Sequence, residues 1–172
     1  IDIILNFVRS PIRNIHASGA PVVSGNVDIA NARLEFENGC VANVTASRIS
    51  MKNERKIRLF QRDAYISVDF ASREITVVRM RGGKYEEILN SDEVRSLGSD
   101  LIPGMDIKQM CFSQGDALED ELRSFVRAVS KRETSEVTGQ MGRDALNIAL
   151  NIMDQIKSKY GEVGGLLSEV GA

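Results

Sequence analysis

The chain has 172 residues, of which 42% are hydrophobic and 27% charged, and its formal net charge is −2 at pH 7. This is an ordinary globular composition, and a near-neutral chain lacks the basic surface by which proteins bind nucleic acid. Cys40 and Cys111 lie far from each other and from the single His16, which argues against a zinc finger or a disulfide scaffold. No run of roughly 18 apolar residues predicts a membrane span, and Ile1–Leu5 has no basic region typical of a secretory signal. We therefore expect a cytoplasmic protein with reduced thiols.

The first predicted element is the end of a helix at Asp2–Val8. It stops before Pro11, which disfavours helical backbone at Ser10. Because the sequence opens inside an apolar-periodic segment and without a Met, we expect it to be part of a longer protein.

Strands are predicted next. From Pro11 to Met80, Val, Ile, Thr and Phe recur with a period near two, which is typical of β-structure. The predicted strands are Ile12–Ala17, Val27–Phe36, Cys40–Ile49, Arg55–Gln61, Ala64–Phe70 and Glu74–Met80, with a short edge strand at Tyr85–Leu89.

The second and third of these strands predict a hairpin. Asn38-Gly39 suits a type I′ turn, whose two central residues both need φ > 0. A two-residue loop would pair Phe36 with Val41 and Leu34 with Asn43. In that register both faces of the hairpin are half apolar. We therefore expect helices over one face and a second copy of the chain over the other.

The last third of the chain predicts an irregular segment followed by helices. Residues 91–115 have no clear periodicity, a helix begins at Asp116, and a second helix covers Met141–Lys159 and ends at Gly161. Residues 161–172 are expected to be a loose tail. The order of elements predicts an α+β fold, an open and mostly antiparallel sheet with helices packed on one face.

Few residues suggest chemistry. His16 lies in a predicted strand, where a half-exposed structural role is the simplest interpretation. No G-x-G-x-x-G motif or P-loop occurs. A basic cluster follows the hairpin: Arg48, Lys52, Arg55, Lys56 and Arg58. It either holds an anionic group, for which the arginine fork is suited, or is an ordinary solvated rim of the sheet.

Three polar residues share one face of a predicted strand. Asn43, Thr45 and Ser47 alternate along it and offer hydroxyl and amide hydrogen bonds to a polar ligand. The alternative is that they pair with polar residues of the neighbouring strand.

Several segments resemble the C-terminal domain of the Gfo/Idh/MocA oxidoreductases, over most of residues 1–157. They are Asp2–Leu5, Val27–Ala30, Leu34–Gly39, Ala42–Arg48, Leu118–Phe125 and Val137–Leu146. The resemblance implies a separate N-terminal Rossmann domain that binds NAD or NADP. It also implies a helical motif D-x-x-x-H-x-x-D whose last Asp is Asp2, so that the catalytic His would fall upstream of Ile1.

The resemblance therefore implies that residues 1–160 are the substrate-binding and oligomerisation domain of an oxidoreductase acting on a sugar, cyclitol or nucleotide sugar. Alone, the chain is expected to bind no cofactor and no metal and to be inactive. The full-length protein is expected to form a dimer or tetramer through the sheet. The expected substrate-binding residues are Asp2, Asn43, Thr45, Ser47, Arg48 and Arg55. The alternative function is a non-catalytic, sheet-based binding or oligomerisation module.

Overall fold

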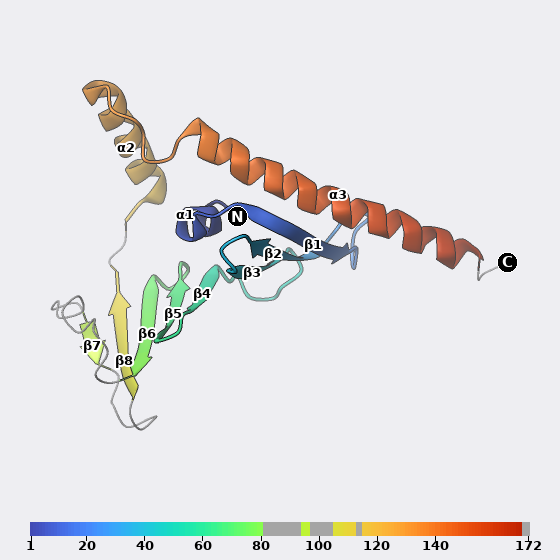
Figure 1. The fold of residues 1–172 in the computed structure, drawn as a ribbon, viewed down its shortest axis with the longest axis horizontal. Helices are drawn as coiled ribbons and strands as arrows, with labels where there is room; N and C mark the ends of the chain where they lie inside the picture. Colours follow the sequence, from blue (N-terminus) through green and yellow to red (C-terminus); the bar gives the residue numbers. More distant parts are fainter. Residues whose placement is uncertain (81–93, 97–104, 113–114, 170–172) are drawn as a thin grey trace. The chain divides into compact units, whose positions relative to one another are not determined.

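The computed structural model describes residues 1–80, 94–96, 105–112 and 115–169. The chain divides into two compact units (Figure 1). The first comprises Ile1–Ser50 and Glu121–Ala172, and the second comprises Met51–Asp120. Helices and open antiparallel sheets make this an α+β fold, as predicted, although the strands form two sheets where the sequence suggested one.

The first unit contains a three-stranded antiparallel sheet in the order β1-β2-β3. Its elements are α1 (Asp2–Val8), β1 (Ile12–Ala20), β2 (Ile29–Phe36), β3 (Val41–Ser47), most of α2 (Ala117–Lys131), and α3 (Gly139–Glu169). The predicted helix at Asp2–Val8 is confirmed. It ends at Arg9, which adopts a left-handed conformation and donates its backbone N–H to the Leu5 carbonyl over 3.1 Å.

The register of the β2–β3 hairpin differs by one residue from the prediction. Leu34 pairs with Ala42, and not with Asn43. The loop has an extra residue: Gly39 takes a φ of 84° and donates its N–H to the Phe36 carbonyl, while Asn38 keeps a negative φ. This is the geometry of a type I turn followed by a bulge, and not of a type I′ turn. The Asn38 side chain stabilises it by accepting the Cys40 N–H over 3.0 Å.

The corrected register separates the two faces of the sheet. Ala32 and Leu34 now lie beside Val44 and Ala42 on one face, whereas Arg33 lies beside Asn43 on the other. One face is therefore apolar and the other mainly polar. The premise that both faces are half apolar, from which a second copy was expected over the free face, is wrong.

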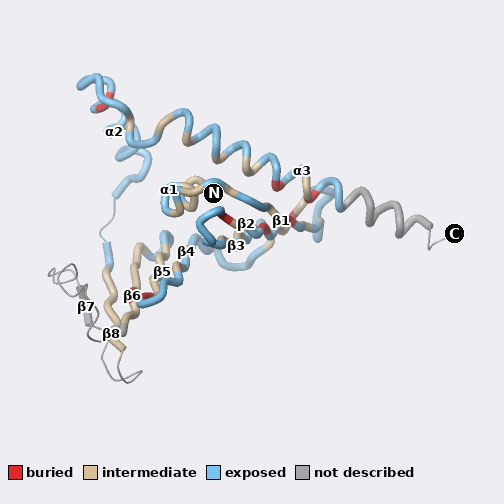
Figure 2. The backbone as a smooth tube through the Cα atoms, viewed as in Figure 1, coloured by how far each residue is buried: buried red, intermediate tan, exposed pale blue. Residues whose placement is uncertain are grey.

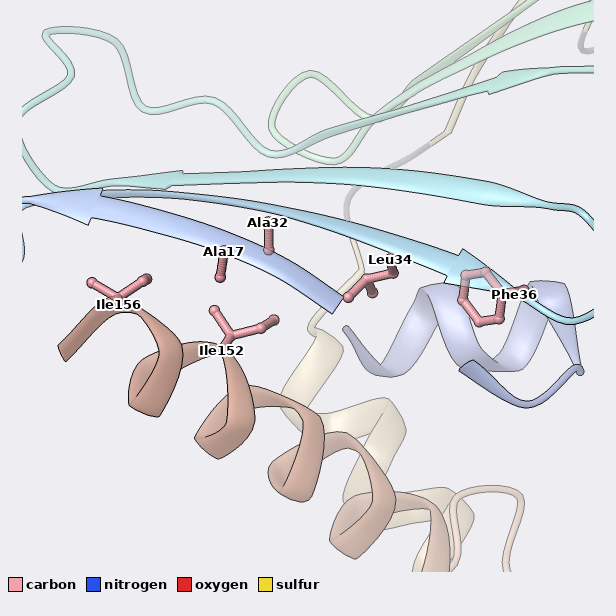
Figure 3. Packing of buried hydrophobic residues seen from close by; sticks show 6 residues of the cluster. All are labelled: Ala17, Ala32, Leu34, Phe36, Ile152 and Ile156. Carbon is pink, nitrogen blue, oxygen red and sulfur yellow. The ribbon is translucent and has the colours of Figure 1, made fainter. Parts of the chain in front are cut away.

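The core lies between the apolar face and the helices. Figure 3 shows Ile152 and Ile156 of α3 beside Ala17 and Ala32, with Leu34 and Phe36 further along the sheet. Leu34 and Ile156 are at most 1% exposed. Apolar residues of α1 and its N-cap residue pack against the same cluster: Ile1, Ile4, Leu5 and Val8. These contacts fix α1 and α3 on the same face of the sheet.

The second unit is a five-stranded antiparallel sheet in the order β4-β5-β6-β8-β7. Its strands are β4 (Lys56–Phe60), β5 (Ala64–Asp69), β6 (Glu74–Met80), β7 (Val94–Ser96) and β8 (Met105–Cys111). The prediction of an irregular segment at 91–115 is wrong for β7 and β8. The apolar residues of β8 do not alternate strictly, and Met, Lys and Gln are weak strand formers, so the pattern was not visible. The predicted strand at Tyr85–Leu89 lies outside the described residues.

The helices begin largely as predicted. The Asp116 carboxylate accepts the backbone N–H groups of Leu118 and Glu119, so it caps α2. Most of α2 is exposed (Figure 2). Helix α3 continues beyond Gly161 to Glu169, so the predicted helix end is wrong and residues 161–169 of the expected loose tail are helical.

Candidate functional site

A groove of about 420 Å³ lies between α1 and the first turns of α3 in the first unit. Its apolar lining is Leu5, Pro11, Ile12, Met141 and Ile148, and its polar lining is Asp2, Asn6, Arg9, Ser10 and Asp144. The volume falls within the range of small-molecule sites, roughly 300–1,000 Å³. The packing of α1 and α3 on one sheet face places these side chains around a common space.

The groove carries two carboxylates and one guanidinium. Asp2 is half-buried in the first turn of α1. Asp144 of α3 accepts a hydrogen bond from the Gln140 amide over 2.7 Å, which orients it. Arg9 donates its Nε to the Asn6 carbonyl over 3.1 Å. Carboxylates accept hydrogen bonds from hydroxyl groups and a guanidinium binds anions, so the set suits a polyhydroxylated, negatively charged ligand.

The predicted residues of β3 lie away from this groove. Asn43 and Thr45 project from the polar face of the sheet, opposite the face that α1 covers. Thr45 donates its hydroxyl to the Asn31 side chain of β2 over 2.8 Å, which is the cross-strand pairing considered as the alternative. The Ser47 hydroxyl accepts the Ile49 N–H over 3.3 Å.

Arg48 has an internal partner. Its Nε lies 2.9 Å from Oδ1 of Asp28, and its Nη2 donates to the Val27 carbonyl over 2.6 Å. Asp28 is 2% exposed and lies directly before β2. The guanidinium is therefore held at the end of the sheet by the protein itself.

The Asp28 carboxylate also organises the loop before β2. Its Oδ2 accepts the successive N–H groups of Val22, Val23 and Ser24 over 2.7, 2.8 and 3.0 Å, and the Ser24 hydroxyl donates to Oδ1. Hydrogen bonds from the N–H groups of Val22 and Val23 lower the pKa of Asp28 well below its usual value. Burial of the carboxylate acts in the opposite direction and is outweighed.

Arg55 belongs to the second unit, and the neighbouring Lys56 pairs with Asp69 over 3.0 Å. That hydrogen bond raises the pKa of Lys56 and lowers the pKa of Asp69.

Of the six predicted site residues, Asp2 lines the groove. Sequence reasoning missed Asn6, Arg9, Ser10 and Asp144, because their proximity depends on how α3 crosses α1.

The described residues lack the structural unit that commonly binds a nicotinamide dinucleotide. Every described strand pair is antiparallel, so the parallel β-α-β unit whose glycine turn cradles a pyrophosphate does not occur among them. The same part of the chain contains no group of three or more His, Cys, Asp or Glu residues arranged to hold a metal ion. Its helices also lack the length and apolar character needed to cross a membrane.

Comparison with known proteins identifies relatives of the whole chain. No family model matches it. UDP-N-acetylglucosamine 3-dehydrogenase from Acidithiobacillus ferrooxidans is 27% identical over 152 residues, which are 88% of this chain and 44% of that protein. Two crystal structures of that enzyme, GnnA, superpose with TM-scores of 0.76 and 0.73, at 26% and 25% identity. Each match covers 91% of this chain, and 46% or 44% of the solved chain.

The chain is homologous to a Gfo/Idh/MocA-type dehydrogenase. The resemblance inferred from the sequence is therefore confirmed. The chain spans less than half the length of the relative that it matches. An NAD-binding protein from Listeria innocua has the same fold, with a TM-score of 0.62 at 11% identity over 92% of this chain and 47% of the other.

Proposed function

We propose that this chain is the C-terminal, substrate-binding domain of a cytoplasmic NAD(P)-dependent oxidoreductase that acts on a sugar nucleotide. The nicotinamide dinucleotide is held by a separate domain of the full-length protein and supplies the hydride chemistry. The observation that carries the proposal is the similarity to UDP-N-acetylglucosamine 3-dehydrogenase over nine-tenths of the chain.

The groove between α1 and α3 supplies the substrate contacts in this proposal. Asp2 and Asp144 would accept hydrogen bonds from sugar hydroxyls, and the apolar side chains between them would cover the ring. Asp2 has a second significance, because by the resemblance it belongs to the helical motif that carries the catalytic His. Asn43, Thr45, Ser47, Arg48 and Arg55 remain predicted substrate residues, and their geometry supports a structural role at least for Thr45 and Arg48.

The test is a turnover assay of the full-length protein with UDP-N-acetylglucosamine and NAD or NADP. We expect reduced nicotinamide to form. Asp144→Asn should raise the KM for the sugar nucleotide about tenfold, because one charge-assisted hydrogen bond is lost. Asp154→Asn, an exposed carboxylate further along α3, is the matched control and should leave KM unchanged. If no reduced nicotinamide forms with NAD and none forms with NADP, the proposal is contradicted.

A non-catalytic assembly module is the second candidate, favoured by the exposed apolar side of α2. Leu118, Leu122, Phe125 and Val129 recur at helical spacing and are 56–63% exposed. This candidate predicts self-association of the full-length protein without any turnover. The dehydrogenase proposal also expects a dimer or tetramer, so turnover is the measurement that separates the two candidates.

A further inference from the structure

Arg9 stands out in the groove because of its backbone. Its φ of 47° places it in the left-handed region that usually favours glycine at the end of a helix. A long side chain at this position has no conformational advantage for the helix end itself. The presence of an arginine side chain here is therefore not explained by the geometry of the helix end.

The guanidinium of Arg9 is oriented and still has donors to offer. Its Nε is held by the Asn6 carbonyl over 3.1 Å, which fixes the plane of the group at the end of α1. Within the described part of the chain, its terminal nitrogens donate to no acceptor, and no carboxylate lies within ion-pair distance of them. Two donors of the planar fork thus remain available on the rim of the groove.

We propose that Arg9 binds the diphosphate of the sugar nucleotide, while Asp2 and Asp144 bind the sugar. This inference rests on the proposed function and assigns the recognition of the nucleotide part to a residue of this chain. A planar fork with two open donors matches phosphate oxygens in a bidentate way. Asp2 begins α1 and Arg9 follows its last residue, so a phosphate bound at Arg9 lies at the opposite end of this helix from the Asp2 carboxylate, which would repel it.

The experiment measures the dissociation constant of UDP for the full-length protein by calorimetry. Arg9→Gly removes the guanidinium and relaxes the backbone, and Arg9→Asn removes it while keeping a residue that tolerates this conformation. We expect both variants to bind UDP about tenfold more weakly or worse, with unchanged binding of free N-acetylglucosamine and no lower Tm. Arg132→Gly is the matched control. Arg132 follows α2 with a φ of 55° and does not line the groove, so its variant should bind UDP as the wild type does.

The outcomes separate this inference from the proposed function. Wild-type affinity for UDP in both Arg9 variants, an equal loss in the Arg132 variant, or no UDP binding by the wild type would overturn the role of Arg9. None of these results affects the turnover assay with UDP-N-acetylglucosamine, which decides the proposed function by itself.

Discussion

Asp28 joins two parts of the first unit through one buried carboxylate: the loop before β2, and Arg48, which follows β3. Backbone N–H groups that point at a single oxygen form an anion-binding nest, and here the occupant is a side chain of the same protein.

Asp28 should make stability depend on pH in acid. Because its pKa is lower in the folded protein than its ordinary value of 3.8, its contribution is complete above that value and is lost as the pH falls below it. Asp28→Asn should lower the Tm at pH 7, and the difference from the wild type should shrink below a pH of about 3.8. Thermal unfolding across this range measures it. Glu37→Gln, an exposed change in the neighbouring turn, is the control, and a constant Asp28→Asn difference down to acid pH would refute the assignment.

Gly19 of β1 lies in close contact with Ile156 of α3 and with residues of a neighbouring segment of the chain. A Cβ at this position would lie 2.8 Å from Val27 Cγ1, 2.9 Å from Ile156 Cγ2 and 2.9 Å from the Ile29 carbonyl oxygen. Gly19→Ala should therefore destabilise the protein by about 1–3 kcal/mol, measured by denaturant unfolding. Gly142 of α3 has open space around it, so Gly142→Ala should stabilise the helix by about 0.5–1 kcal/mol. Equal effects of the two substitutions would show that the helix does not pack this closely.

At the scale of the element, α3 protects the free edge of β1. Gln155 accepts the Ala17 N–H over 3.1 Å, and Lys159 donates to the Ala17 carbonyl over 2.9 Å. Both backbone groups of a residue that is 3% exposed are thereby satisfied by side chains from one helix. An edge strand whose polar groups are covered is also a poorer template for aggregation.

Removing one of these contacts should be costly. Gln155→Ala leaves the buried Ala17 N–H without its acceptor and should lower the free energy of unfolding by about 1–3 kcal/mol. Asp154→Ala, at the adjacent exposed position, should change it by less than about 0.5 kcal/mol. Denaturant unfolding of both variants checks the prediction, which fails if the two values agree.

The elements show what the sequence could and could not predict. Apolar periodicity predicted β4, β5 and β6, and the Asp116–Glu119 capping pattern predicted the start of α2, because both signals are local. The hairpin register failed because Asn38-Gly39 fits two turn types, and the choice between them is made by packing. Only the register that puts Ala42 and Val44 beside Leu34 buries all three against the helices. A comparison of two-residue and three-residue loops, judged by the alternation of apolar and polar residues in both strands, would have favoured the observed register.

At the scale of the whole molecule, the resemblance to a family gave more specific expectations about function than the chemistry of individual residues did. The homologous dehydrogenase matches the chain across both compact units. The site was predicted less well. Asp2 was predicted through the resemblance, whereas the groove that it lines depends on the packing of α1 beside α3, two segments more than 130 residues apart in the sequence. Local sequence patterns contain no signal for such proximity.

In the proposed function, the groove between α1 and α3 receives a sugar nucleotide. Hydrogen exchange of the full-length protein, with and without saturating UDP-N-acetylglucosamine, tests it most directly. We predict slower exchange of backbone amides in residues 2–12 and 139–148, and little change across residues 41–47 of β3, which lie away from the groove. Protection confined to residues 41–55, with none around the groove, would contradict the account.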